Sequence, residues 1–315
     1  MEVFRICGGN SLSGVVNISG SKNAALPQFA ATLLSSEKSI LKNVPNLSDV
    51  RFMAEILSEL GAEIRKVDHT TWEINPANIS YKAPYELVRK MRASICLLGP
   101  LVGRLKKAEI PMPGGCVIGQ RPIDLHIRAL TRLGANIELE KGIVKVEGKN
   151  LRGNKIFLGG RHGSTVTGTT NAIMAAVLAP GITTIDSSAC EPEIIDLCNM
   201  LLSMGAKISG IGSHSLEIEG VSKLSGCNHT VMPDRIEAAT YAIAAAITQG
   251  KVTLDGAKPE HLGSFINVMQ DSGISMDVHQ SDQIKVYLNN GELNSLEIIT
   301  LPYPGFPTDL QAQSC

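Results

Sequence analysis

The chain has 315 residues, of which 43% are hydrophobic and 4% aromatic, which is enough for two domains with buried cores. Its 29 Lys and Arg residues against 30 Asp and Glu residues leave a formal net charge of −1, so composition gives no general attraction to nucleic acid or an anionic membrane. Seven cysteines without a Cys-x-x-Cys pair disfavour a metal or disulfide scaffold and favour a reducing compartment. Apolar segments fall short of the roughly 20 residues that span a bilayer, and the first residues lack a signal-peptide pattern, so we expect a cytoplasmic protein.

An internal repeat organises the chain. A helix-like segment that ends in Leu-Gly-Ala or a close variant, followed by a polar strand-like run, occurs four times. The glycines are Gly61, Gly134, Gly205 and Gly273, at intervals of 73, 71 and 68 residues. This spacing indicates repeated units of about 70 residues. We interpret each glycine as the C-cap of the helix before it.

The elements of each unit follow in a constant order. Each unit begins with a helix of small residues, predicted at 23–34, 90–102, 171–178 and 235–248. A short strand comes next, clearest at 182–185 and 251–254, then an amphipathic helix such as 193–204, then two strands such as 206–209 and 215–219. The prediction is an α/β fold built of α+β repeats, with apolar helices packed on sheets.

A fifth unit begins near the end of the sequence. Residues 307–313 align with residues 233–239, and the sequence ends at Cys315. We therefore expect the sequence to stop inside a repeat.

A glycine-rich segment at 113–126 carries the first candidate for chemistry. Gly114, Gly115 and Gly119 surround Cys116, which predicts a mobile loop with a thiol. Arg121 follows five residues later and would lower the thiol pKa or hold an anion. An exposed glycine turn with an incidental cysteine explains this stretch equally well.

Three further positions carry functional residue types. Lys22 and Arg92, like Arg121, stand at the ends of predicted elements, where side chains and helix N-termini jointly bind phosphate or carboxylate groups. Asp309 adds a carboxylate after a proline turn. Taken singly, each is better explained without a function: Lys22 as a solvated helix start, Arg92 as a surface cation and Asp309 as a helix cap.

Taken together, six segments resemble the UDP-N-acetylglucosamine 1-carboxyvinyltransferase family, the enolpyruvyl transferases that begin peptidoglycan synthesis. These segments are residues 18–27, 91–94, 113–126, 191–194, 233–237 and 304–313. The resemblance implies an inside-out α/β barrel of six units, three per domain, with the active site in the cleft between the domains. One domain would comprise residues 22–231, and the other residues 1–21 together with 232–315.

The resemblance also implies an activity. Enolpyruvyl would pass from phosphoenolpyruvate to the 3-hydroxyl of UDP-N-acetylglucosamine, without cofactor or metal, in a monomer that fosfomycin inhibits. Cell wall biogenesis, cell shape and cell division would depend on this reaction. The family's additional arginines that grip phosphoenolpyruvate belong to the units missing here, so activity of the 315-residue chain is in doubt.

Site residues carry over from the family's motifs position by position. Cys116 would be the general acid, Asp309 would contact the sugar 3-hydroxyl, and Lys22 would bind phosphoenolpyruvate together with Arg121. Asn23 would hold the sugar nucleotide near the reacting centre, and Arg92 would contact the bound ligands. The uridine and diphosphate site would be lined by Pro122, Ile123, Asp124, Leu125, Arg161, Thr165 and Val166, the last three in a loop that departs from the family's pattern.

Two alternatives remain open at this stage. A shikimate-3-phosphate enolpyruvyl transferase shares the fold and the phosphoenolpyruvate substrate, although the Cys116 loop and residues 121–126 argue against it. A non-catalytic UDP-sugar-binding homologue belongs to another functional class. Binding without turnover would distinguish it from an enzyme.

Overall fold

The computed structural model describes residues 3–114, 122–161, 163–278, 282–288, 293–295 and 297–315. The chain divides into two compact units. Unit 1 comprises Met1–Ser19 and Pro233–Cys315, and unit 2 comprises Gly20–Met232. Each unit has its own hydrophobic core.

Unit 2 contains three of the repeats. The first repeat consists of α1 (Lys22–Thr32), β2 (Ser39–Lys42), α2 (Ser48–Glu59), β3 (Glu63–Lys66) and β4 (Trp72–Asn75). The second consists of α3 (Tyr85–Val88), the 3-10 helix η1 (Arg92–Leu97), α4 (Leu98–Leu105), β5 (Lys107–Pro111), α5 (Asp124–Arg132), β6 (Asn136–Glu140) and β7 (Ile143–Glu147). The third consists of β8 (Lys155–Phe157), α6 (Val166–Ala176), β9 (Ile182–Asp186), α7 (Pro192–Ser203), β10 (Lys207–Ser209) and β11 (Ser215–Glu219), and β12 (Asn228–Thr230) closes the unit.

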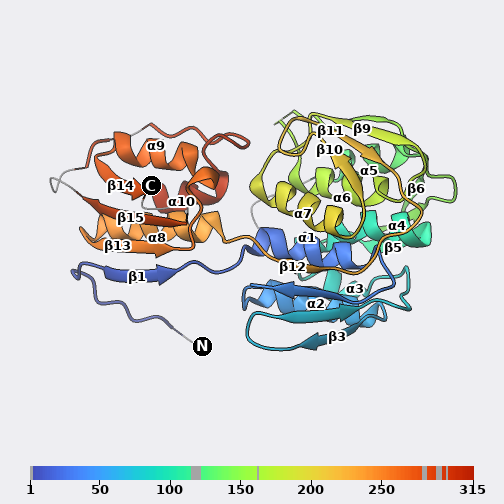
Figure 1. The fold of residues 1–315 in the computed structure, drawn as a ribbon, viewed down its shortest axis with the longest axis horizontal. Helices are drawn as coiled ribbons and strands as arrows, with labels where there is room; N and C mark the ends of the chain where they lie inside the picture. Colours follow the sequence, from blue (N-terminus) through green and yellow to red (C-terminus); the bar gives the residue numbers. More distant parts are fainter. Residues whose placement is uncertain (1–2, 115–121, 162, 279–281, 289–292, 296) are drawn as a thin grey trace. The chain divides into compact units, whose positions relative to one another are not determined.

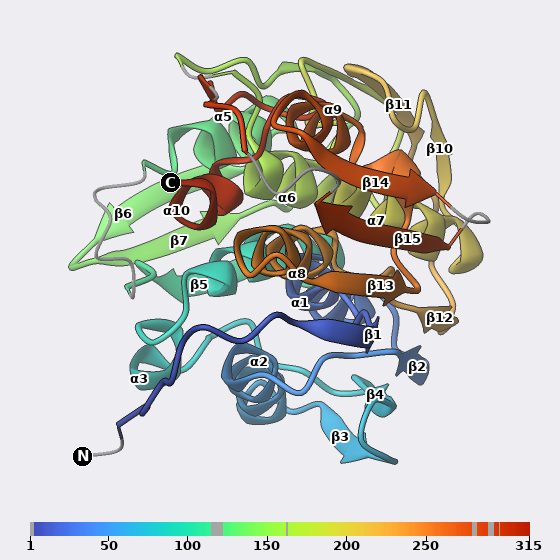
Figure 2. The ribbon, with the colours of Figure 1, turned by 90° about the vertical axis from the view of Figure 1, so that its left-hand side faces the viewer.

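Unit 1 contains the fourth repeat. Its elements are β1 (Ser13–Asn17), α8 (Arg235–Ile247), β13 (Lys251–Asp255), η2 (Pro259–His261), α9 (Gly263–Asp271), β14 (Ile274–Val278) and β15 (Gln283–Leu288), followed by η3 (Thr308–Leu310) and α10 (Gln311–Ser314). Figure 2 shows β14, β15, β13 and β1 side by side in that order, with α8 and α9 packed along the sheet. The predicted order of helix, strand, helix and two strands is confirmed in all four of these repeats.

The repeat glycines end the second helix of each unit in a left-handed conformation. Their φ angles are 106° at Gly61, 98° at Gly134, 98° at Gly205 and 90° at Gly273. Residues with a Cβ adopt this region at a cost, so glycine is favoured there. The predicted C-caps are confirmed.

Among the described residues, three of the four sheets have one strand that the repeat pattern did not predict. In the sheets β12-β2-β4-β3, β8-β9-β11-β10 and β1-β13-β15-β14, the first-named strand pairs in parallel with the first strand of a repeat. In the sheet β5-β7-β6, a single parallel bridge between Lys82 and Glu109 occupies that place. These strands come from the connections between repeats, so periodicity within one repeat does not reveal them.

Two of the predicted first helices differ in their bounds. The segment predicted as 90–102 begins as the 3-10 helix η1 before α4, because Pro100 has no N–H to donate to the carbonyl of residue 96. The helix predicted from Asn171 begins at Val166, because the Thr165 side chain accepts a hydrogen bond from Gly168 N and caps an earlier turn.

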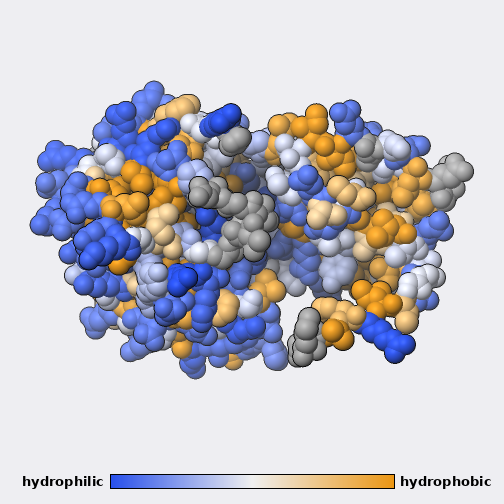
Figure 3. All heavy atoms as spheres, turned by 180° about the vertical axis from the view of Figure 1, so that it is seen from behind, coloured by the Kyte–Doolittle hydropathy of each residue, from blue (hydrophilic) through white to orange (hydrophobic). Residues whose placement is uncertain are grey.

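The core of unit 2 is built mainly from helices. Figure 1 shows its three sheets at the periphery, with helices filling the space between them. Phe29 of α1 is fully buried and meets Trp72 of β4 edge-on, with ring centroids 5.7 Å apart. On the face seen in Figure 3, hydrophilic and hydrophobic residues are interspersed, as expected when most large apolar side chains lie inside.

Candidate functional site

The buried helices α1, α4 and α6 of unit 2 run parallel to one another, so their amino ends lie on one side of the unit. Along α4 and α6, Gly99 faces Asn171 and Gly103 faces Met174, so contact advances in the same direction on both helices. A Cβ on Gly99 would lie 2.6 Å from Asn171 O, so only glycine permits this close approach. The carboxyl ends of α1 and α4 also meet, since Arg104 Nη1 donates to Leu33 O over 3.1 Å. The amino ends of α1, η1 and α6 therefore lie together on the opposite side.

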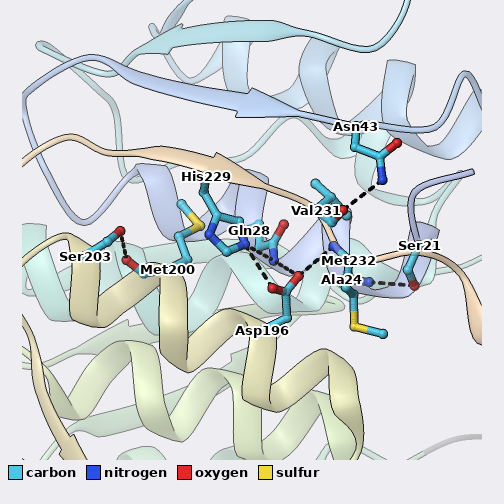
Figure 4. Close-up of polar contacts among 10 residues, drawn as sticks. All are labelled: Ser21, Ala24, Gln28, Asn43, Asp196, Met200, Ser203, His229, Val231 and Met232. Atoms are coloured by element: carbon cyan, nitrogen blue, oxygen red, sulfur yellow. Dashed lines mark hydrogen bonds and ion pairs between the residues drawn. The ribbon is translucent and has the colours of Figure 1, made fainter. Parts of the chain in front are cut away.

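The amino end of α1 carries Lys22 and Asn23. The Ser21 hydroxyl caps the helix by accepting a hydrogen bond from Ala24 N over 3.3 Å (Figure 4). Lys22 is partly exposed, and its Nζ lies 3.3 Å from Asp49 Oδ2 in the first turn of α2. Asn23 is exposed. The helix end and the Lys22 ammonium together favour an anion here.

The amino ends of η1 and α5 bring a second group of predicted residues together. Arg92 is the first residue of η1, and Asp124 is the first residue of α5. Burial, with the positive charge of Arg92 as a further cause, lowers the pKa of His126 to about 4, while the Asp124 charge acts in the opposite direction. Arg92, Asp124 and His126 are thus close enough to interact electrostatically. Of the neighbouring predicted residues, Pro122 is exposed, Ile123 is buried and Leu125 is half-buried.

The amino end of α6 carries the remaining predicted residues of this unit. Thr165 is the N-cap, and Val166 is the first helical residue. Arg161 is exposed in a turn between Gly160 and Gly163, which are joined by the hydrogen bond from Gly160 N to Gly163 O at 2.8 Å. This short turn brings the chain from β8 to the N-cap of α6.

The other three predicted site residues lie in unit 1 or outside the described residues. Asp309 lies in η3 of unit 1 and is exposed. Cys116 and Arg121 lie outside the described residues. The structure therefore brings together Arg92, Asp124 and the starts of α1 and α6, and it leaves the roles of Cys116, Arg121 and Asp309 as predictions.

Asn171 and His126 are buried polar residues that the sequence analysis did not assign to the site. They lie in α6 and α5, close to the predicted residues at the starts of these helices. Asn171 of α6 is fully buried, and its Nδ2 lies 2.8 Å from His126 Nδ1. Thr167 Oγ1 lies 3.1 Å from His126 Nε2. A polar residue in an apolar, small-residue helix was the available signal, because a buried amide must find hydrogen-bond partners.

A second buried polar cluster anchors the segment where the chain leaves unit 2. Asp196 Oδ2 accepts hydrogen bonds from Gln28 Nε2 at 2.7 Å and from Met232 N at 3.1 Å (Figure 4). His229 Nε2 of β12 lies 3.1 Å from Asp196 Oδ1 and 3.2 Å from Gln28 Nε2. Met232 O also accepts from Ser21 N over 2.8 Å, so the cluster holds β12 and its extension against α1 and α7.

The carboxyl ends of the same helices are closed by cations. Arg104 donates to four carbonyl oxygens, those of Leu33, Ser35, Pro76 and Ala77, over 2.6–3.1 Å. Lys106 Nζ donates to Gly103 O over 2.6 Å. Burial lowers the pKa of both side chains. A pocket of about 230 Å³ lies at this end, and none of the predicted site residues lines it.

Metal ligands and membrane segments were also sought. Within the described ranges, no three His, Cys, Asp or Glu side chains are grouped so that they could hold a metal ion. Over the same residues, no helix combines the length and apolar character that crossing a membrane requires.

Comparisons with known proteins extend these observations. The family model of EPSP synthase (3-phosphoshikimate 1-carboxyvinyltransferase) matches residues 6–315. A UDP-N-acetylglucosamine 1-carboxyvinyltransferase from Methylacidiphilum infernorum is 54% identical over 315 residues, which cover 100% of this chain and 74% of that protein. One with the same name from Akkermansia muciniphila is 48% identical over 314 residues, which cover 99% of this chain and 74% of that protein.

Solved structures share the fold at lower sequence identity. The enolpyruvyl transferase NikO from Streptomyces tendae superposes with a TM-score of 0.87 at 22% identity, over 98% of this chain and 72% of that one. An EPSP synthase from Acinetobacter baumannii superposes with a TM-score of 0.67 at 19% identity, over 94% of this chain and 68% of that one. The predicted fold class is confirmed by these neighbours.

Proposed function

The chain belongs to the EPSP synthase family of enolpyruvyl transferases, and from this premise we propose that it transfers the enolpyruvyl group of phosphoenolpyruvate to the 3-hydroxyl of UDP-N-acetylglucosamine, with release of phosphate. The observation that carries the proposal is the convergence of three helix amino ends with Lys22 and Arg92. Relatives that share about half of its residues over the whole chain support UDP-N-acetylglucosamine as the acceptor.

Both proposed substrates carry several negative charges, which Lys22, Arg92 and the amino ends of α1, η1 and α6 would attract. Phosphoenolpyruvate carries a carboxylate and a phosphate, for which we propose Lys22 and Arg121 as partners. The diphosphate of the sugar nucleotide would meet Arg92 and helix N-termini, and Asn23 would hold the sugar. The residues proposed to line the uridine and diphosphate site are Pro122, Ile123, Asp124, Leu125, Arg161, Thr165 and Val166. Cations and backbone N–H groups at helix starts are general partners for such anions.

The proposed chemistry needs one acid and one base. Cys116 would give its thiol proton to the terminal carbon of phosphoenolpyruvate, which makes the adjacent carbon electrophilic. The sugar 3-hydroxyl oxygen would add to that carbon while Asp309 takes its proton. Loss of phosphate, together with a proton from the terminal carbon, then restores the double bond. Lys22 and Arg121 would stabilise the charge that moves onto the phosphate.

The wider role follows from the product. We propose that the reaction is the first committed step of peptidoglycan synthesis, that it takes place in the cytoplasm in a monomeric protein, and that cell wall biogenesis, cell shape and cell division depend on it. Fosfomycin, an epoxide that resembles phosphoenolpyruvate, would alkylate Cys116.

Phosphate release in the presence of each acceptor tests the proposal. The chain is incubated with phosphoenolpyruvate and either UDP-N-acetylglucosamine or shikimate 3-phosphate, and the product is identified by mass spectrometry. We expect phosphate release with UDP-N-acetylglucosamine as the acceptor and none with shikimate 3-phosphate. Release with shikimate 3-phosphate alone would contradict the proposed acceptor.

Binding of the sugar nucleotide without turnover would support the non-catalytic alternative. If calorimetry detects UDP-N-acetylglucosamine binding but no phosphate appears, the chain acts as a sugar-nucleotide-binding protein. Mass spectrometry after incubation with fosfomycin then asks whether Cys116 reacts. An adduct that the sugar nucleotide enhances and Cys116→Ala abolishes would support the assembled site.

A further inference from the structure

We propose that Asn171 and His126 form a buried clamp that positions the sugar-nucleotide site. This inference rests on the proposed function, because it assigns the clamp to segments that would bind UDP-N-acetylglucosamine. Both residues are buried, with exposed fractions of 0% for Asn171 and 2% for His126, so neither side chain is placed to touch a substrate. They would act by holding other residues in place.

The Asn171 side chain joins three elements. Its Oδ1 accepts a hydrogen bond from Gly99 N in α4 over 2.6 Å. Its Nδ2 donates to Ile95 O in η1 over 2.9 Å and to His126 Nδ1 in α5 over 2.8 Å. Because the acceptor and both amide hydrogens are used, the orientation of the amide is determined, and α6 is tied to η1, α4 and α5.

The same hydrogen bonds determine the tautomer of His126. Because Nδ1 accepts from the Asn171 amide, the ring proton is on Nε2, which donates to Thr167 Oγ1 over 3.1 Å. Burial and the Arg92 charge lower the pKa of His126 to about 4, so the ring is neutral at physiological pH. The clamp is therefore a neutral, fully paired network, and such networks hold their members in one arrangement.

Each element that the clamp joins through Ile95, His126 or Asn171 begins with a residue of the proposed binding site. Arg92 lies three residues before Ile95, within the same 3-10 helix. Asp124 lies two residues before His126, in the first turn of α5. The Thr165 cap lies six residues before Asn171, at the start of α6. A loss of the clamp would let these three helix starts shift relative to one another. A displacement of about 1 Å is enough to lower the rate of a reaction between positioned groups about a hundredfold.

Asn171→Leu tests the clamp, because leucine keeps the volume and removes every hydrogen bond of the amide. We expect the dissociation constant for UDP-N-acetylglucosamine, measured by calorimetry on the full chain, to rise tenfold to a hundredfold. His126→Phe should raise it similarly. The double variant should bind no worse than the weaker-binding single variant, because both changes break one unit.

Arg104→Met is the matched control. It removes a partly buried set of four hydrogen bonds at the opposite end of the same helices. We expect it to lower the unfolding temperature while the dissociation constant changes less than twofold. An equal loss of affinity in Arg104→Met would overturn the clamp, because affinity would then merely follow stability.

A milder variant guards against failure to fold. Asn171→Asp keeps the shape and the acceptor for Gly99 N but has at most one hydrogen to donate, so it cannot donate to both Ile95 O and His126 Nδ1 as the amide does. Wild-type affinity in a folded Asn171→Asp chain would also overturn the clamp. If the wild-type chain itself does not bind UDP-N-acetylglucosamine, the proposed function fails, and this outcome is distinct from binding that the variants leave unchanged.

Discussion

The two ends of the buried helices in unit 2 both carry cations, but the cations stand in opposite electrostatic settings. At the carboxyl ends, Arg104 and Lys106 donate to backbone carbonyls. At the amino ends, Lys22 and Arg92 are the first residues of α1 and η1. A helix dipole favours a cation at its carboxyl end and disfavours one at its amino end.

This difference separates structural cations from those that we propose bind substrate. Arg104 and Lys106 satisfy backbone carbonyls at the end of α1, near the end of α4 and in the loops that follow α1 and β4, so their placement lowers the energy of the fold. Lys22 and Arg92 gain nothing from the dipoles of their own helices, in keeping with the substrate-binding roles that we propose for them. Binding residues are commonly retained at a cost to stability. The free energy of unfolding should therefore respond differently at the two ends.

The largest expected effect concerns His126 and pH. In the folded chain its pKa is about 4, against an ordinary value of 6.5. The unfolded chain therefore binds more protons between these values, and the free energy of unfolding falls as pH drops from 6.5 to 4, by about 3 kcal/mol from this residue. Urea denaturation at several pH values, compared between wild type and His126→Gln, measures this contribution. Parallel pH profiles for the two proteins would refute it.

The next effect concerns Arg104. Replacement by methionine leaves the carbonyls of Ser35 and Pro76 without their donor, and we expect a loss of about 2 kcal/mol in the free energy of unfolding. Urea denaturation at pH 7 checks this. Arg104→Lys should recover part of the loss, because one ammonium replaces some of the hydrogen bonds. A neutral effect of Arg104→Met would mean that these carbonyls do not need Arg104 as a donor.

The smallest effect on stability is expected at Lys22. Its contact with Asp49 is partly exposed, and such pairs contribute about 0–1 kcal/mol, which the unfavourable helix end offsets. We expect Lys22→Met to change the free energy of unfolding by less than about 0.5 kcal/mol, while phosphate release from phosphoenolpyruvate falls strongly. A variant that unfolds easily yet keeps its activity would reverse the contrast between the two ends.

The repeat and its local features could be predicted from the sequence. The spacing of Gly61, Gly134, Gly205 and Gly273, the order of elements and the strands at 215–219 and 251–254 depend on short-range patterns, and all are present. Turn chemistry and apolar periodicity act within a few residues, so they are visible in any window of the chain. The parallel edge strands β1, β8 and β12 were missed because their partners lie in other parts of the sequence.

The candidate site could be predicted from the sequence only in part. Motifs identified its residue types, including Lys22, Arg92 and the segment from Pro122 to Leu125, and their roles stay predictions. Only the tertiary structure brought Asn171 against His126, Gly99 and Ile95, which are 45, 72 and 76 positions away in the chain. A buried amide takes its partners from whatever backbone and side chains packing brings near it, so its hydrogen bonds are decided by how α6 packs against η1, α4 and α5 and not by its neighbours in sequence.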